Sequence, residues 1–338
     1  MWYECDSRFI AAHDQPAGLI DLALSRGIDS HRLLRGCGLF YEDIASGQAL
    51  ISPQQYLQLI ANAQRLLGDD DLSFLYGQRL LPGHYGEASL ALQRSADLLQ
   101  ALEHLCASHA LLSPLLRPSL LLDEQNLYLY WLDSCGAGPQ RRFLLEACQT
   151  SVLALSRQLS GQRLPWRLQF AHAEPAHVEQ YWVHLGEEVR FSSQLTLMSL
   201  PRQYLHQPCP GASPTAQQVS AQRCRQHLEQ LGWRDSFLDC LYDHLQEHIR
   251  QPLNLERVAA TFGMSPASFK RKLQKHGSHF QEQLDRVRKH RALYLYQIKG
   301  YTNEEVAQHL CFNDTTNLRR SFKRWTGLAP SGLGRGFG

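Results

Sequence analysis

The chain has 338 residues, of which 43% are hydrophobic and 20% are charged, and its formal net charge is +2. It does not begin with the charged, apolar and cleavage regions of a secretory signal, and apolar stretches such as ALLSPLLRPSLLL are broken by Pro and Arg well short of a membrane span. The composition therefore predicts a soluble chain, long enough for two domains, with no membrane partner.

The nine cysteines are scattered, odd in number and nowhere arranged as C-x-x-C. This distribution argues against a disulfide framework and against a thiolate metal site, and it predicts a reducing, cytoplasmic location. Each cysteine is expected to be a small buried hydrophobe. No metal and no cofactor is expected.

Charge is unevenly divided between the two halves of the chain. Residues 1–215 contain 15 Arg and no Lys against 21 acidic residues, a net charge of −6, whereas residues 216–338 contain 13 Arg and 6 Lys against 11 acidic residues, a net charge of +8. Such a split is typical of an acidic module joined to one that meets a polyanion. We expect a first domain over residues 1–199 and a basic domain over residues 216–338.

The acidic half is expected to mix helices and strands. Apolar periodicity predicts helices over Pro16–Leu34, Pro53–Leu67, Ser95–His109 and Gln140–Leu159. The stretch SLLLDEQNLYLYWLD predicts two strands joined at a Glu-Gln-Asn turn, and RLQFAHAEP another strand. An α+β fold of this kind offers an apolar pocket for a small effector, and the residues expected to line it are His84, Tyr85 and Arg117. A structural role is the alternative for each of the three.

The stretch LPRQYLHQPCPGASPT, residues 200–215, contains four prolines and has no helical period. It is expected to be the linker between the two domains.

The basic half contains one helix-turn-helix pattern twice. In the second copy, Thr302 and Glu305 form a capping-box pattern before a short helix, and Asn313 or Asp314 is expected to cap the helix that contains LRRSFKRW. The upstream stretch NLERVAATFGMSPASFKRKLQKHG aligns with it, and Ser265 there is the expected cap. The sequence therefore predicts an all-α domain of two helix-turn-helix motifs joined by a long helix.

The second helix of each motif separates apolar from polar side chains. At 100° per residue, Leu318, Phe322 and Trp325 form an apolar stripe, and the opposite side carries Thr316, Arg319, Arg320 and Lys323. In the upstream copy Phe269 and Leu273 point inward, and the outward side chains are Ala267, Lys270, Arg271 and Gln274. Two such helices on one connector are expected to enter successive major-groove segments of double-stranded DNA, which recur about every 34 Å.

These residues resemble the DNA-binding domain of AraC/XylS-type bacterial transcription regulators. The family's second motif is matched by Val306-Ala307, Leu310-Cys311-Phe312, Phe322-Lys323-Arg324-Trp325, Gly327 and Pro330. The first motif is similar to that of a subgroup related to the ornithine-utilisation regulator. The stretches from LISPQQYLQLI and LSGQRLPWRLQ resemble that subgroup's arabinose-binding-type effector domain, so the likeness covers about residues 15–335.

The resemblance implies a regulator that binds promoter or operator DNA, works with RNA polymerase, and dimerises and binds a small-molecule effector through its first domain. It places DNA-facing positions at Ala267, Lys270 and Arg271 in the first motif and at Thr315, Thr316, Arg319 and Arg320 in the second. Cys311 stands where the family has glycine, and at positive φ its Cβ would cost about 1 kcal/mol. Ala267 is small for a residue that reads bases.

Three other functions compete with DNA binding. HLQEH, from His244 to His248, matches an inverted zinc-protease pattern, although the sequence indicates no third ligand. Cys209 would be the alkyl acceptor of a repair protein, but no neighbouring His or Arg activates its thiol. A non-catalytic interaction module is the third alternative, and salt-dependent DNA binding distinguishes it. The sequence favours a regulator that is not an enzyme.

Overall fold

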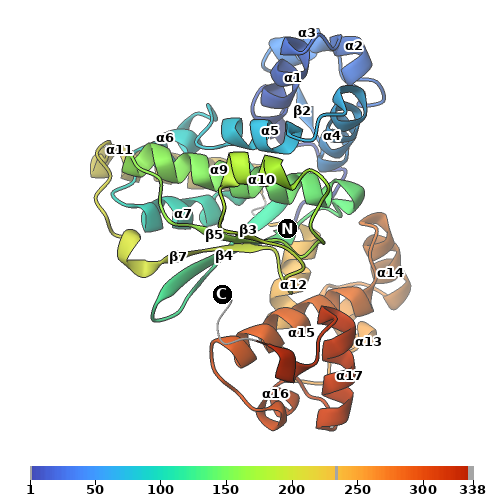
Figure 1. Cartoon of the computed structure of the whole chain (residues 1–338). Helices are drawn as coiled ribbons and strands as arrows, with labels where there is room; N and C mark the ends of the chain where they lie inside the picture. The colour runs from blue at the N-terminus through green and yellow to red at the C-terminus, as the bar shows by residue number, and fades with distance from the viewer. Residues whose placement is uncertain (1, 233–234, 334–338) are drawn as a thin grey trace. The chain divides into compact units, whose positions relative to one another are not determined.

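The computed structural model describes residues 2–232 and 235–333 (Figure 1). The chain forms two compact units, Met1–Ser236 and Phe237–Gly338. The first mixes helices with a five-stranded sheet, and the described part of the second is helical, as the sequence predicts. Among the described residues, no helix is both long enough and apolar enough to cross a membrane.

The five-stranded sheet of the first unit has the strand order β3-β4-β7-β5-β6, and β1 pairs with β2 in a separate two-stranded sheet. Neighbouring strands are antiparallel, except for β5 and β6, which are parallel. The hairpin between β3 and β4 is the one predicted, and Asp123 closes it by accepting hydrogen bonds from the backbone N–H groups of Gln125 and Asn126 at 2.8 and 2.7 Å. The strand bounds are Leu116–Leu122 (β3), Asn126–Asp133 (β4), Arg167–Gln169 (β5), Val189–Arg190 (β6) and Leu197–Pro201 (β7).

The helix α9 is the central helix of this unit and runs across the sheet in Figure 1. It packs closely on α5, because Gly77 presents no side chain where the backbone of Ala147 approaches. The helices are α1 (Gln15–Ser25), α2 (Ser30–Leu33), α3 (Tyr41–Ala45), α4 (Pro53–Leu67), α5 (Leu72–Leu80), α6 (Glu87–Gln93), α7 (Leu98–Ala107), α8 (His109–Leu112), α9 (Arg141–Ser160), α10 (Val178–Leu185) and α11 (Pro214–Leu231). Short elements complete the unit: β1 (Ile10–Ala11), β2 (Leu50–Ile51), η1 (Gly138–Gln140) and η2 (Arg202–Tyr204).

The predicted helix Pro53–Leu67 is confirmed, and Ser52 and Gln55 form its capping box. The prediction of one helix over Pro16–Leu34 is wrong, because α1 ends at Ser25 and Gly27 follows at φ 79°, a conformation that breaks the helix.

The expected linker and the start of the second domain lie within the first unit. Pro201 ends β7, η2 follows, and α11 occupies residues expected to belong to the basic domain. Cys224 and Leu228 of α11 are buried in the core of the first unit, and Arg223 pairs with Glu87 on α6. The division between the compact units therefore falls after Ser236.

The described part of the second unit begins with α12, and two helix pairs follow with the long helix α15 between them in the chain. The core contains Phe237, Val258, Phe269, Leu273, Val287, Leu318 and Phe322, all buried. The helices are α12 (Phe237–Glu247), α13 (Leu255–Thr261), α14 (Pro266–Lys275), α15 (Phe280–Gln297), α16 (Asn303–His309) and α17 (Thr315–Thr326), followed by η3 (Pro330–Gly332).

His309 at the end of α16 is held in its neutral form. It is 8% exposed, and Nε of Arg291 donates a hydrogen bond to its Nε2 at 3.1 Å, which requires an unprotonated Nε2. Burial lowers the pKa of His309 to about 4, and the charges of Arg291 and Arg250 act in the same direction. Below about pH 6.5 the unfolded chain therefore takes up a proton that the folded chain does not bind.

We expect the free energy of unfolding to fall as the pH drops from about 6.5 towards 4, with a contribution from His309 of at most about 1.4 kcal/mol per pH unit. Above that range His309 contributes no pH dependence. His309→Gln keeps an acceptor for Arg291 and should make the pH dependence shallower. A histidine ring NMR titration, assigned with this variant, measures the pKa directly. A midpoint near 6.5 would contradict the expectation.

Candidate nucleic-acid interface

Each helix-turn-helix motif is built from capped helices and a turn with a residue at positive φ. In the first motif, the turn contains Gly263 at φ 66°, and the Ser265 hydroxyl accepts a hydrogen bond from the N–H of Ser268 at 3.2 Å. In the second, Thr302 and Glu305 form the predicted capping box. Asp314, rather than Asn313, caps α17, since its Oδ1 accepts from the N–H of Asn317 at 2.7 Å.

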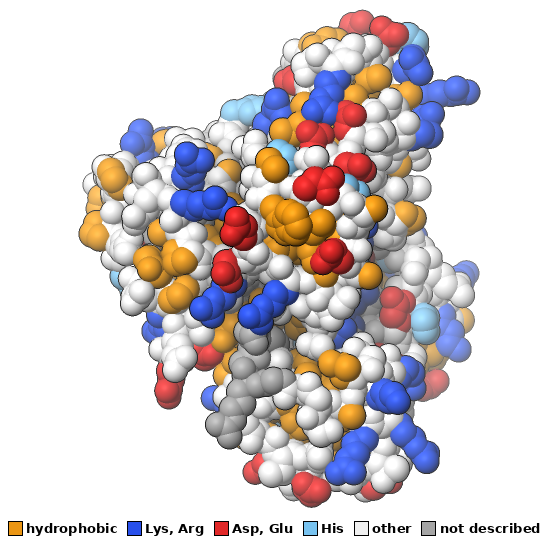
Figure 2. Space-filling model, in the orientation of Figure 1, with side chains coloured by type: hydrophobic (Ala, Val, Ile, Leu, Met, Phe, Trp, Pro, Cys, Tyr) orange, Lys and Arg blue, Asp and Glu red, His pale blue; other side chains and the backbone are white. Residues whose placement is uncertain are grey.

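The recognition helices α14 and α17 bury one side and expose the other. Phe269 and Leu273 anchor α14, and Leu318 and Phe322 anchor α17, each at 0% exposure. All the side chains predicted to point outward are exposed: Ala267, Lys270, Arg271 and Gln274 on α14, and Thr316, Arg319, Arg320 and Lys323 on α17. Thr315, at the start of α17, is half-buried. Figure 2 shows Lys and Arg side chains gathered on the surface over α17.

Arg324 forms an ion pair within the second unit, which the charge pattern of the sequence alone does not reveal. Its side chain is 63% exposed, yet its Nη2 lies 2.8 Å from Oδ2 of Asp285 on α15. This ion pair joins the recognition helix to the connector. The sequence places Arg324 in the same basic run as Arg319 and Arg320, and only the packing of α17 on α15 distinguishes them.

A cluster of planar groups lies at the turn of the second motif. The guanidinium of Arg288 lies 5.1 Å from the ring centroid of Phe312, and the rings of Phe312 and Trp325 are 5.9 Å apart. Burial lowers the pKa of Arg288, although arginine stays charged at any physiological pH. Through Phe312, this cluster links Trp325 near the end of α17 to Arg288 on α15, and the sequence pattern did not indicate these contacts.

Cys311 has the positive φ that its alignment with a family glycine implies, with φ 56°. We expect Cys311→Gly to raise the free energy of unfolding of the second unit by about 1 kcal/mol, because glycine adopts this conformation without a Cβ clash. Urea denaturation followed by circular dichroism measures the change. Cys311→Ala keeps the Cβ and should give no such gain; an equal gain from alanine would assign the effect to the thiol instead.

The histidines of HLQEH make structural contacts within the second unit. Nδ1 of His248 bonds the carbonyl of His244 at 2.9 Å, and the His244 ring packs edge-on to Phe262. Burial lowers the pKa of His244. Both side chains therefore take part in the packing of the second unit.

Cys209 is 6% exposed, and burial raises the pKa of its thiol, with Asp97 acting in the same direction. An alkyl-accepting cysteine needs the opposite, a thiolate stabilised by neighbouring cations. The geometry around Cys209 therefore does not favour alkyl transfer.

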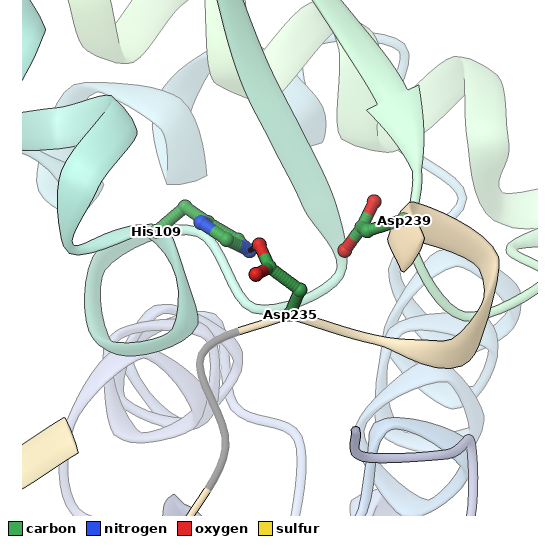
Figure 3. Close-up of side chains that lie close together, drawn as sticks. All are labelled: His109, Asp235 and Asp239. Atoms are coloured by element: carbon green, nitrogen blue, oxygen red, sulfur yellow. Dashed lines mark ion pairs between the residues drawn. The ribbon is translucent and has the colours of Figure 1, made fainter. Parts of the chain in front are cut away.

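The three expected effector residues lie in two places in the first unit. The rings of His84 and Tyr85 lie side by side, with centroids 5.4 Å apart, and Nε2 of His84 bonds the carbonyl of His13. Tyr85 is buried, and this burial raises the pKa of its hydroxyl. Arg117 lies on β3, with its Nη1 3.8 Å from Oδ1 of Asp235. His109 lies 3.7 Å from the same oxygen, and Figure 3 shows this pair. Ligand contact at His84, Tyr85 and Arg117 stays a prediction.

Two capped recognition helices on one connector, preceded in the chain by an α+β unit, define a transcription regulator with a double helix-turn-helix DNA-binding domain. The protein-family model for the N-terminal arabinose-binding domain of the AraC transcription regulator matches residues 27–209. The family model for a helix-turn-helix domain matches residues 258–335. The chain belongs to the AraC family of transcription regulators, with an arabinose-binding-type effector domain at its N-terminal side.

Relatives match along nearly the whole chain. The ornithine utilization regulator of Pseudomonas aeruginosa is 29% identical over 314 residues, which is 93% of each chain. An uncharacterized HTH-type transcriptional regulator of Mycobacterium tuberculosis is 21% identical over 330 residues, 94% of each chain. The crystal structure of the transcriptional regulator CdpR from Pseudomonas aeruginosa is 21% identical and covers 94% of this chain and 96% of its own, with a TM-score of 0.45.

Proposed function

We propose that α14 and α17 enter successive major-groove segments of promoter or operator DNA. The observation that carries this proposal is that each helix is anchored by two fully buried side chains and exposes a row of polar and cationic ones. The contacting residues would be Ala267, Lys270, Arg271, Gln274, Thr315, Thr316, Arg319, Arg320 and Lys323.

The exposed side chains divide by chemistry into those that bind phosphate and those that read bases. Lys270 and Lys323 are point charges suited to phosphate, whereas Arg271, Arg319 and Arg320 can bond either phosphate or the O6 and N7 of guanine. Gln274 has the donor and acceptor pattern that matches adenine, and Ala267 and Thr316 can contact a thymine methyl group.

The first unit would act as the sensing and dimerising part, in a homodimer that works in the cytoplasm with RNA polymerase and catalyses no reaction. The family membership supports this proposal, as do the regulator names of its relatives. A small-molecule effector that changes DNA affinity must itself bind with an affinity that depends on DNA, because the coupling is reciprocal.

The test of DNA binding is fluorescence anisotropy with duplexes from the region upstream of the gene. A protein with 6 to 10 phosphate contacts should lose about 10³ to 10⁵ in affinity between 50 and 200 mM salt. Affinity that does not change with salt, or no binding at low salt, would exclude this function and favour an interaction module.

A further inference from the structure

The first unit contains a groove beside the C-terminal ends of α9 and α10, which we call the α9–α10 groove. Its volume is about 620 Å³, within the range of small-molecule sites, which is about 300–1,000 Å³. A second cavity of this unit, lined in part by Tyr56, Tyr76 and Trp131, has a volume of about 30 Å³, room for about one water molecule. Of these two, only the α9–α10 groove has room for an organic ligand.

The charged side chains that line this groove are both arginines. Arg157 stands in the last turn of α9, and Arg163 follows the end of that helix. No acidic side chain is among the described residues that line it. His184 adds no charge at neutral pH, because burial lowers its pKa. The groove therefore attracts an anion.

The rest of the lining supplies an apolar surface with a few neutral polar groups. Leu164, Trp166 and Leu185 are buried, while Val183 is 74% exposed at the edge. Nε2 of Gln78 lies at hydrogen-bonding distance, 3.2 Å, from Nδ1 of His184, so these two atoms are paired with each other. A ligand with an apolar body and one charged end matches this division.

The helix ends that flank the groove limit the charge of its ligand. Gly161 caps the C-terminus of α9, and Leu185 is the last residue of α10. Helix C-termini carry partial negative charge, which disfavours a doubly charged anion such as a phosphate dianion. A singly charged anion can bind here because Arg157 and Arg163 neutralise its charge. Arg163 already donates to the carbonyl of Leu185 at 3.2 Å, which leaves Arg157 the less committed of the two arginines.

We propose that the α9–α10 groove binds a small organic monocarboxylate whose apolar body lies against Trp166 and Val183 and whose carboxylate pairs with Arg157 and Arg163. Arginine suits a carboxylate because two of its N–H groups can bond both oxygens. The ligand's role as the effector rests on the regulatory function proposed above, whereas its binding does not.

The test uses the full chain with indole ¹⁵N–¹H NMR, in which Trp166 is assigned through Trp166→Phe. The probes are phenylacetate, benzoate, hexanoate and 4-methylpentanoate, each paired with its neutral amide. We expect at least one acid to shift the Trp166 signal saturably at millimolar concentration or below, and its amide to bind at least tenfold more weakly. No saturable shift with any of the acids, or equal binding of acid and amide, would overturn the proposal.

Three variants and a control locate the site. Arg157→Gln should weaken binding at least tenfold, and Ala154→Trp, which fills the groove without removing charge, should do the same. Arg163→Gln should act similarly where circular dichroism shows a native fold; Arg157→Gln keeps the test valid if it does not. Arg65→Gln, an exposed arginine on α4, should bind as the wild type does. Unchanged binding by Arg157→Gln and Ala154→Trp would overturn the proposal.

Salt-dependent DNA affinity without probes, measured on the same preparations, separates this proposal from the regulatory one. Normal DNA binding with no carboxylate binding excludes the groove as the site and leaves the DNA-binding function intact. Carboxylate binding without DNA binding supports the groove as a ligand site and excludes the proposed DNA-binding function. An increase in oligomeric state in place of probe binding would assign the groove to a second copy of the chain.

Discussion

Replacing Arg320 by glutamate is expected to lower operator affinity at least 100-fold. Arg320 is exposed on α17, two residues after the fully buried anchor Leu318. The substitution removes a cation from the surface proposed to face DNA and adds a charge that phosphates repel. Fluorescence anisotropy at a fixed salt concentration measures the loss, and the salt slope should fall by about 1 for each lost phosphate contact.

Two control variants separate DNA contact from damage to the fold. Arg65→Glu makes the same charge change on an exposed position of α4 and should leave DNA affinity within about threefold of the wild type. Arg320→Lys keeps the charge and should retain affinity for random duplexes; if Arg320 reads guanine, it should also relax base preference at one position. Unchanged operator affinity in a folded Arg320→Glu protein would remove α17 from the interface.

Replacing Gly77 by alanine is expected to destabilise the first unit by about 2 kcal/mol. A Cβ at this position would lie 2.5 Å from the carbonyl oxygen of Ala147 and 2.7 Å from the Cβ of Thr150. Because the nearest atom belongs to the backbone of α9, relief requires the two helices to separate. The melting temperature followed by circular dichroism should fall by at least about 4 °C.

Gly18→Ala is the matched control, because Gly18 also lies inside a helix of the first unit. A Cβ there would lie 3.8 Å from the ring of Tyr76, an ordinary contact. The variant should be neutral or stabilising by up to about 1 kcal/mol, since alanine is the better helix former. Equal stability losses at both positions would show that close packing of α5 on α9 is not the cause.

The second unit follows from its sequence because its determinants are local. Caps such as Ser265 and Thr302 stand within three residues of the groups they satisfy, and the wheel of α17 needs only the spacing of Leu318 and Phe322. The positive φ of Cys311 also follows from its alignment with a family glycine, and Gly263 in the turn of the first motif has a similar φ. Because the motif occurs twice in the sequence, each of these inferences has two independent examples.

The first unit depends on contacts between segments distant in the chain. For this reason the sequence pattern predicted fewer of its features than of those of the second unit. The stretch LPRQYLHQPCPGASPT has the composition of a linker, yet α11 after it joins the first unit because Cys224 and Leu228 find a core far upstream. The α9–α10 groove likewise brings Gln78, Arg157 and Val183 together from three separate helices. No local periodicity indicates such a set, and the expected effector residues were chosen elsewhere.

We propose above that α14 and α17 of one chain read two adjacent major-groove segments. The most direct measurement is methylation interference at guanine N7 on an operator obtained by selection from random duplexes. We expect two clusters of interfering guanines per protein chain, about 10 base pairs apart. Arg271→Ala should weaken one cluster, and Arg320→Ala the other. A single cluster per chain, or two clusters that respond together to either variant, would show that α14 and α17 do not read separate groove segments.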